Sequence, residues 1–307
     1  MSWNDQQTFV HATLENEVNR KYPLHVDYQI AFLKHVIHQL EQHGSKEIHD
    51  SFYLLLAIQM AKQKPDFSYK HFVTESDNEP ITVKESNSFV RDGTTGLKMW
   101  PAAMALGDFV LQNKERFGNK SILELGSGAT GFVGLLLIKA CSPRMVLLSD
   151  CHEAVIDTLV ENVNLNLSNA TREQGMTSIL IRQFHKLSSG SELGVLNMPW
   201  EDIDKLEDEL RSLGKLDVLL ASDVVYDDSL FDALISCIAK LFSISNSTPT
   251  FYLSQTIRNP ETFDKFCHLL HAEGFATFQE EVKFGKIYNE DSKSEIKILR
   301  IAKQQVT

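Results

Sequence analysis

The sequence predicts an α/β fold whose main part is a doubly wound, mostly parallel sheet. From residue 121 onward, short apolar runs alternate with longer segments of helical periodicity, which is typical of strand–helix–strand units. A glycine-rich turn follows the first apolar run and leads into a helix, as in sheets that bind a ligand at their strand ends. The last two apolar runs are too close together to enclose a helix, so they should form an antiparallel hairpin.

Seven strands are expected in this sheet, at residues 122–125, 145–148, 178–181, 216–221, 250–253, 275–284 and 295–301. Five helical segments separate the first six strands, at residues 131–141, 153–166, 201–213, 229–242 and 260–273. A further helix over residues 101–113 precedes the first strand, with Pro101 suited to its first turn, and strand-like pieces lie at residues 81–83 and 89–90. Crossover helices should cover both faces of the parallel part.

The N-terminal part is expected to be helical. Asn4 and Asp5 offer a cap for a first helix, a second helix runs over residues 27–42, and a third begins near residue 45 and stops before Pro65. Their predicted apolar faces hold Phe9, Val10, Leu14 and Val18, then Ile30, Leu33, Ile37 and Leu40, then Ile48, Phe52, Leu55, Leu56 and Met60. We therefore expect a small helical domain over residues 1–75 and an α/β domain over residues 76–307.

Composition narrows the classes of partner. The chain has 307 residues, 43% of them hydrophobic, and a formal net charge of −11, which disfavours a general affinity for nucleic acid or anionic lipid. Its four cysteines form no C-x-x-C pair, so free thiols in a reducing compartment are expected, and no metal site. Residues 1–5 lack an apolar signal core and no apolar run is long enough to cross a bilayer, so we expect a cytoplasmic or nuclear protein without a membrane partner.

The glycine-rich turn predicts a cofactor site. Gly126, Gly128 and Gly131 lie between the first strand and its helix, where backbone without side chains can approach a ligand closely. Asp150 ends the second strand, and a carboxylate there can accept hydrogen bonds from ribose hydroxyls. The pattern indicates an adenosine-bearing cofactor, and the alternative is a tight turn kept for packing. The turn by itself does not distinguish a nicotinamide dinucleotide from S-adenosylmethionine.

Three further segments decide between them: Asp223-Val224-Val225-Tyr226, Leu97-Lys98-Met99-Trp100-Pro101-Ala102-Ala103 and Leu196-Asn197-Met198-Pro199-Trp200. With the glycine turn, Asn162-Val163 and Asn166, they make residues 93–301 resemble the seven-strand protein-lysine methyltransferases, whose signature is an acidic residue, two variable positions and an aromatic. The N-terminal helices resemble one branch of that family, the elongation factor 2 lysine methyltransferases, through Tyr22-Pro23, Tyr28-Gln29, Phe32-Leu33-Lys34, Ile37, Glu41, Ile48-His49-Asp50, Phe52-Tyr53 and Gly93-Thr94-Thr95-Gly96-Leu97.

The resemblance implies a Rossmann-like methyltransferase sheet with S-adenosylmethionine as cofactor. It also implies a protein substrate, elongation factor 2, no direct nucleic-acid binding, and action as a monomer. By position, it implies cofactor contacts at Trp100, Gly126, Ser127, Gly128, Asp150, Trp200 and Ser222, and catalytic roles for Asp223 and Tyr226. The chain departs from the family at Ser222, where a small residue such as alanine is common, and at Glu201, where glycine often follows the tryptophan.

Methyl transfer to lysine needs a neutral amine, whereas a lysine in water has a pKa of about 10.4. Asp223 could hold the amine and compensate developing positive charge, but a carboxylate also stabilises the ammonium form. We therefore assign Asp223 to orientation and charge compensation rather than to base catalysis; the alternative is that it caps the following helix. Tyr226 would wall the lysine channel or lie at its rim. Trp100 and Trp200 would offer aromatic surface to the cofactor or belong to the core.

Other functions remain possible on the residues alone. One alternative is a lysine methyltransferase that acts on another protein, either a chaperone or a different elongation factor. A nicotinamide-dependent oxidoreductase shares the glycine turn and Asp150 but leaves Asp223 to Tyr226 unexplained. A nucleic-acid amino methyltransferase would carry two prolines where Val224 and Val225 stand. A non-catalytic adaptor would use only the helices for binding.

Overall fold

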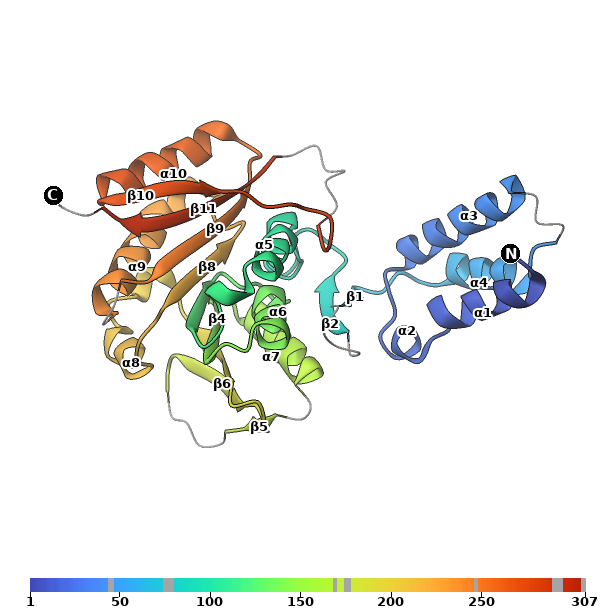
Figure 1. Ribbon diagram of the computed structural model, residues 1–307, viewed down its shortest axis with the longest axis horizontal. Coiled ribbons are helices and arrows are strands. Elements are labelled where there is room, and N and C mark those ends of the chain that lie inside the picture. Colours follow the sequence, from blue (N-terminus) through green and yellow to red (C-terminus); the bar gives the residue numbers. More distant parts are fainter. Residues whose placement is uncertain are drawn as a thin grey trace. The chain divides into compact units, whose positions relative to one another are not determined.

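The computed structural model describes residues 1–43, 47–73, 80–167, 170–173, 178–245, 248–288 and 295–304. The chain divides into two compact units (Figure 1). The helical unit comprises Met1–His71 and Thr82–Phe89, and the sheet unit comprises Phe72–Ile81 and Val90–Thr307. The predicted domain boundary after residue 75 falls outside the described residues and stays a prediction.

In its described part, the helical unit contains four helices and most of a two-stranded sheet: α1 Trp3–Thr13, α2 Glu17–Lys21, α3 Val26–Gln42, α4 Asp50–Ala61, β1 Phe67–Phe72 and β2 Ile81–Ser86. Its buried cluster is Val10, Leu33, Ile37, Leu40 and Phe52. These residues come from the three predicted apolar faces.

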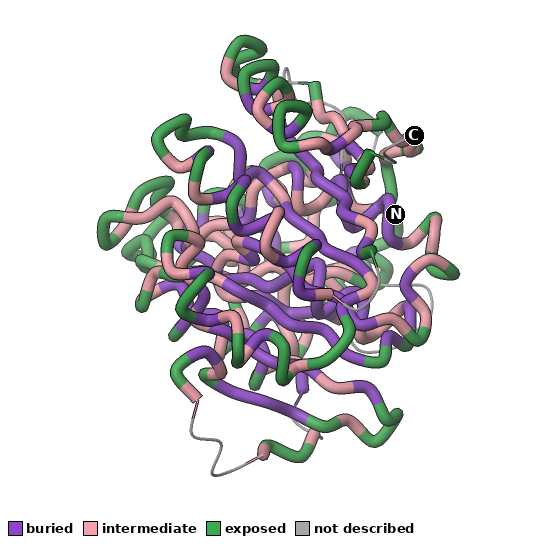
Figure 2. Tube along the Cα trace, turned by 90° about the vertical axis from the view of Figure 1, so that its left-hand side faces the viewer, coloured by how far each residue is buried: buried purple, intermediate pink, exposed green. Residues whose placement is uncertain are grey.

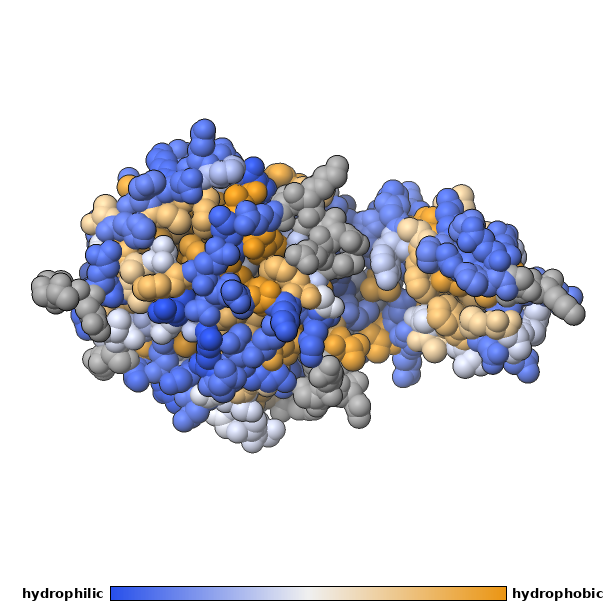
Figure 3. Space-filling view, turned by 45° about the horizontal axis from the view of Figure 1, so that its top comes forward, coloured by the Kyte–Doolittle hydropathy of each residue, from blue (hydrophilic) through white to orange (hydrophobic). Residues whose placement is uncertain are grey.

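Several details of this unit differ from the sequence prediction. Val18, expected on the face of the first helix, lies in the separate helix α2. Ser2, rather than Asn4 or Asp5, caps α1, and Asp5 completes the capping box. Met60, predicted on the buried face of α4, is 61% exposed. Helix α4 has apolar residues on all sides, and three more of them are also exposed: Tyr53, Leu54 and Ile58. Figure 3 shows hydrophobic residues reaching the surface of the helical unit. Strand β1 was not predicted, because the polar residues Ser68, Lys70 and His71 interrupt the apolar pattern by which a strand is recognised.

Within the described residues, the sheet unit is built on one sheet of nine strands, not the seven predicted, in the order β10-β11-β9-β8-β3-β4-β7-β6-β5. Its strands are β3 Ser121–Leu125, β4 Met145–Asp150, β5 Thr171–Arg172, β6 Ile181–Lys186, β7 Glu192–Asn197, β8 Val218–Ser222, β9 Thr250–Thr256, β10 Phe275–Glu280 and β11 Ile296–Lys303. Five central strands, from β9 to β7, are parallel, and β10 and β11 form the expected antiparallel hairpin. The predicted α/β architecture is confirmed.

Helices cover both faces of the sheet (Figure 1). They are α5 Pro101–Gln112, α6 Phe132–Ala140, α7 Glu153–Asn166, α8 Glu207–Ser212, α9 Phe231–Ile244 and α10 Pro260–Ala272, with short 3-10 turns η1 Lys114–Arg116, η2 Trp200–Asp202 and η3 Asp228–Leu230. The core between the sheet and α8 to α10 includes Leu123, Leu147, Leu219 and Phe251. Figure 2 shows buried residues running through the central strands. These strands are buried on both faces, which explains their unbroken apolar runs.

The third parallel strand was placed wrongly. Residues 178–180 form no strand, and β4 pairs instead with β7, which returns antiparallel to β6 after a turn at Gly190. Leu196 and Asn197 therefore belong to the strand that they were expected to follow. The predicted helix over residues 201–213 consists of η2 and the shorter α8. Phe89 and Val90 form no strand and are 66% and 65% exposed.

A buried carboxylate ties the hairpin connection to α5. Asp108 is fully buried and accepts hydrogen bonds from the backbone N–H groups of Gly285, Ile287 and Tyr288. Gln112, one turn further along α5, donates to the carbonyl of Lys283 and accepts from its N–H. Three backbone donors on one carboxylate hold this segment firmly to the helix. Within the described residues, no helix has the length and apolar character needed to cross a membrane.

Candidate active site

The carboxyl ends of β3, β4, β7 and β8 lie at one edge of the sheet because these strands are parallel neighbours. The glycine turn follows β3, and the chain continues to β4 on one side while β8 pairs on the other. This reversal of strand order is where open α/β sheets bind ligands. Asp150 ends β4, Ser222 ends β8, and Trp200 begins η2 shortly after β7. The fold therefore brings the predicted site residues to one edge.

Two glycines of the turn have no room for a side chain. Gly126 and Gly128 have φ of 60° and 62°, a region that glycine enters at little cost. A Cβ on Gly126 would lie 2.9 Å from Cγ1 of Val224 and 3.6 Å from Cζ2 of Trp200. A Cβ on Gly128 would lie 3.1 Å from the carbonyl oxygen of Gly96. The turn is thus packed between the segments that carry the other predicted residues.

Ser127 forms hydrogen bonds to other residues of the protein. Its hydroxyl donates to the carbonyl of Glu124 at 3.2 Å and accepts from the N–H of Ser149 at 3.0 Å. Its own N–H donates to the carbonyl of Ser149 at 2.8 Å. From α7, the amide of Asn162 donates to the carbonyl of Ala129 at 2.7 Å. These bonds fix the turn against β4 and α7 before any ligand arrives.

Asp150 orients the same turn and keeps acceptor capacity. Its carboxylate accepts from the N–H groups of Gly128 at 3.1 Å, Cys151 at 2.9 Å and His152 at 3.3 Å. Burial raises the pKa of Asp150, and these three hydrogen bonds oppose the rise. A carboxylate offers about four lone-pair positions, so three donors leave one for a ligand hydroxyl.

Sequence reasoning missed two buried polar groups beside the turn. Glu124 is 1% exposed, and its Oε2 has no hydrogen-bond partner in the described part of the chain. Burial raises the pKa of Glu124 to about 8, against a smaller opposing effect of its hydrogen bond with the backbone of Gly134 in α6. Nδ1 of His152 is likewise buried without a partner in that part. Such atoms point to a polar ligand.

The raised pKa of Glu124 predicts a pH effect on stability. The unfolded carboxyl ionises near its ordinary pKa of 4.5, whereas the folded one stays protonated to about pH 8. The folded state therefore binds the extra proton between these values, and stability falls as pH rises through this window. Glu124→Gln mimics the neutral form, so its Tm should exceed that of the wild type by more at pH 8 than at pH 6. Differential scanning calorimetry of the ligand-free protein measures this, and an equal difference at both pH values would contradict it.

Asp223 follows β8 with a φ of 54° and is 7% exposed. Oδ1 accepts from the N–H of Thr256 at 2.9 Å and from Nε2 of Gln255 at 3.2 Å, and Oδ2 accepts from the hydroxyl of Thr256 at 3.0 Å. The cap of the following η3 is Asp227, whose side chain accepts from the N–H of Ser229. The alternative that Asp223 caps that helix is therefore wrong.

A third residue that contacts Asp223 was not anticipated from the sequence. Arg258, two residues beyond β9, donates from Nη1 to Oδ1 and from Nη2 to Oδ2, each at 3.2 Å. Its guanidinium carbon also lies 5.0 Å from the centre of the Trp100 ring, a cation–π distance. No local signal marks Arg258, because its role depends on the adjacency of β8 and β9.

The aromatic residues lie around the same edge. Nε1 of Trp100 donates to the carbonyl of Thr95 at 3.1 Å, and Trp200 packs partly buried against the main core. Tyr226 is 57% exposed as a whole residue, yet its hydroxyl group is partly buried among neighbouring side chains. Burial of that end, with Asp150, Asp227 and Cys151 nearby, raises the pKa of Tyr226 despite a hydrogen bond with the Thr95 side chain.

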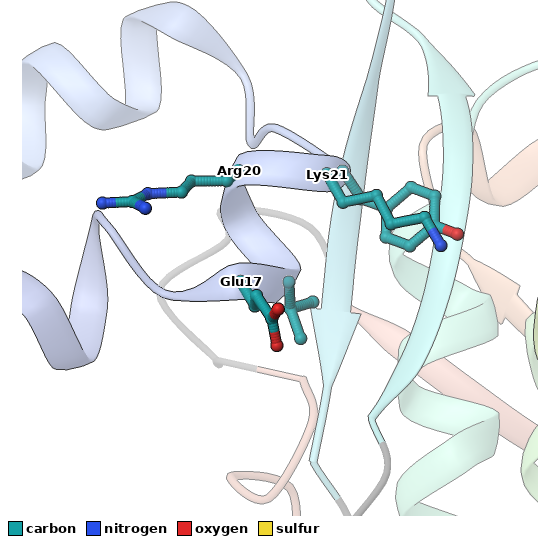
Figure 4. Close-up of a pocket in the computed structure, with 5 residues that line it drawn as sticks. Glu17, Arg20 and Lys21 are labelled. Carbon is teal, nitrogen blue, oxygen red and sulfur yellow. The ribbon is translucent and has the colours of Figure 1, made fainter.

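A separate hollow of about 650 Å³ lies on the helical unit. Its lining residues come from α2 and the residue after it: Glu17, Val18, Arg20, Lys21 and Tyr22. In Figure 4, Arg20 and Lys21 extend in different directions from α2. None of the predicted site residues lines this hollow. Within the described ranges, no cluster of three or more His, Cys, Asp or Glu side chains is arranged to hold a metal.

Comparison with known proteins identifies the family. A family model described as lysine methyltransferase matches residues 75–272. The chain belongs to the lysine methyltransferase family. The protein-lysine N-methyltransferase EEF2KMT of Bos taurus is 29% identical over 296 residues, covering 94% of this chain and 84% of that protein. The human protein of that name is 31% identical, covering 84% and 74%. The protein-lysine N-methyltransferase EFM3 of Chaetomium thermophilum is 32% identical, covering 65% and 54%.

This lysine methyltransferase uses S-adenosylmethionine and acts on protein lysine. The chemistry of the site fits that cofactor. Asp150 has a remaining acceptor position, and Gly126 and Gly128 present backbone without Cβ atoms. Glu124 and His152 each hold a buried polar atom without a partner among the described residues.

Proposed function

We propose that this enzyme methylates a lysine of elongation factor 2. The observation that carries the proposal is the extent of the similarity. The alignment with bovine EEF2KMT spans 94% of this chain, so it reaches well into the N-terminal helices, beyond the residues 75–272 matched by the family model. A substrate of that kind also implies a cytoplasmic location. The helical unit would then contribute to recognition of this large protein.

The cofactor would be held at the strand ends. Asp150 would accept from its ribose hydroxyls, while Gly126 and Gly128 would allow the backbone to approach. The other predicted contacts, Ser127, Trp100, Trp200 and Ser222, would border the same site. Bound there, S-adenosylmethionine supplies a methyl group activated by its positively charged sulfur.

Asp223 and Tyr226 would act on the lysine. Asp223 is held rigidly by donors from the end of β9, so it would present a fixed negative charge near the nitrogen as that nitrogen becomes positive. Tyr226 would wall the channel through which the lysine side chain enters, with its hydroxyl fixed by Thr95. Both roles concern placement and charge, because the amine must arrive without its proton.

Labelling an extract tests the substrate. The purified enzyme and tritiated S-adenosylmethionine are added to a cell extract, and the labelled band is identified by mass spectrometry. We expect label on a lysine of elongation factor 2. Label on a chaperone or on a different elongation factor would reject the substrate and leave the enzyme class intact. An extract with Asp223→Asn enzyme serves as the control and should remain almost unlabelled.

A further inference from the structure

The carboxylate of Asp223 has no vacant acceptor position. Its two oxygens offer about four lone-pair positions, and five donors from three residues occupy them: Gln255, Thr256 and Arg258. A lysine nitrogen that approaches this carboxylate would therefore interact with it through its electrostatic field, because no acceptor position is left for a direct hydrogen bond.

The field is that of a pair of charges. The guanidinium of Arg258 meets both oxygens of Asp223 in the planar, two-bond geometry that arginine forms with carboxylates. Its position over the ring of Trp100 holds it there from the other side. The pair has no net charge, and Arg258 presents a side chain 42% exposed to solvent, against 3% for Asp223. An arriving ammonium thus encounters the cation of the pair on the accessible side.

We propose that Arg258 is a positioning residue that offsets the charge of Asp223, so that the acceptor lysine is bound as the neutral amine. This inference rests on the role proposed above for Asp223. The lysine gives its proton to water before the reaction. Its nitrogen then bonds to the methyl carbon as the carbon–sulfur bond breaks, with that electron pair going to sulfur. An unpaired Asp223 would instead stabilise the ammonium, which has no lone pair for attack.

Other ionisable groups lie on the segments that carry the pair and on the segments next to them. Asp227 and Tyr226 follow on the same loop, Asp150 and Cys151 lie near the hydroxyl of Tyr226, and Lys98 precedes Trp100. Glu295 and Lys297 come from the start of β11, beside the end of β9. All of these remain in the variants below, so a change in pH dependence between variants reports the altered charge at residue 258.

The test compares Arg258→Gln, which removes the charge, with Arg258→Lys, which keeps it. The measurement is kcat against pH from 6 to 10 with saturating elongation factor 2, since kcat reports ionisations in the enzyme–substrate complex. If the wild type labels another protein instead, that protein replaces it as substrate. We expect the rising limb of Arg258→Gln to move up by about one pH unit, as for loss of one nearby charge. Arg258→Lys should lose kcat several-fold, with its limb within about 0.3 unit of the wild type.

A binding measurement gives a second readout that needs no turnover. Substrate is titrated into enzyme saturated with S-adenosylhomocysteine, by calorimetry in two buffers of different ionisation enthalpy at pH 8. Wild-type enzyme should release close to one proton per substrate bound, and Arg258→Gln clearly less. Affinity for S-adenosylhomocysteine should stay within about twofold in both variants, which also confirms that they are folded.

Three outcomes would overturn the inference. Equal loss of kcat by Arg258→Gln at every pH would mean a purely structural role. An unshifted limb with unchanged proton release would mean that the charge of Arg258 does not act on the lysine. A more active Arg258→Gln would mean that Arg258 blocks the site. Label on a protein other than elongation factor 2 rejects only the proposed substrate, because the pH comparison is then made with that protein.

Discussion

Asp223→Asn is expected to lower kcat by about 10²- to 10³-fold, the range seen when a fixed group that stabilises a transition-state charge is removed. Asparagine is the right replacement, because it tolerates the φ of 54° at this position and still accepts from the N–H of Thr256. Alanine would add backbone strain and leave several donors unpaired. Single-turnover methylation measures the effect, and calorimetry with S-adenosylhomocysteine should give an affinity within about threefold of the wild type.

The matched control is Asp228→Asn, five residues further along the same loop. Asp228 is exposed and forms an ion pair with the surface residue Lys265, so its replacement should leave kcat unchanged. If Asp223→Asn retained more than a third of wild-type kcat, or if Asp228→Asn lost as much, the role proposed for Asp223 would be wrong. In Asp223→Asn, the charge of Arg258 is no longer offset by a carboxylate. This charge disfavours the ammonium form of the lysine, so the rising limb of kcat against pH should move to lower pH.

Gly126→Ala is expected to weaken cofactor binding at least tenfold and to destabilise the fold. The alanine would have to adopt a positive φ, and its methyl group would lie 2.9 Å from Cγ1 of Val224, the residue after Asp223. Backbone strain and overpacking together should cost about 2–4 kcal/mol, which corresponds to a fall in Tm of about 5–15 °C. Thermal unfolding and calorimetry with S-adenosylhomocysteine measure the two effects, and we expect Kd to rise at least tenfold at a temperature where the variant is folded.

Gly214→Ala separates the two causes. Gly214 also has a positive φ, of 83°, but a Cβ there would meet nothing within 4 Å. This variant should show the backbone cost alone, about 1–2 kcal/mol, with Kd unchanged. Equal effects of the two substitutions on Kd would show that the space around Gly126 does not matter for the cofactor.

The sequence predicted best where local chemistry and sheet position agree. From β3 onward, buried strands alternate with helices, and the glycine turn and Asp150 need only their places in that alternation to be recognised. The prediction failed at β6 and β7, because a hairpin with the short turn at Gly190 interrupts the strand–helix rhythm. The apolar run of β7 was read as a motif after a strand rather than as the strand itself.

Long-range features of the site were beyond reach of the sequence. The pairing of Asp223 with Arg258 depends on two parallel strands that end side by side. The two residues are 35 positions apart in the sequence, and this separation is not a recognisable motif. Glu124 looks like an ordinary strand residue until burial on both faces of the sheet is known. Residues recognised through family motifs, such as Trp100 and Tyr226, were found because their identity, rather than their contacts, carries the signal.

The place of β11 in the sheet has a consequence for synthesis of the chain on the ribosome. This strand lies between β9 and β10, although both of these are translated before it. Until it emerges, β9 and β10 each have an edge with unsatisfied backbone groups, which invites association with other nascent chains. The sheet can therefore be completed only after β11 has been synthesised, and a frameshift or nonsense codon just upstream of residue 296 should yield an aggregating product rather than a weakened enzyme.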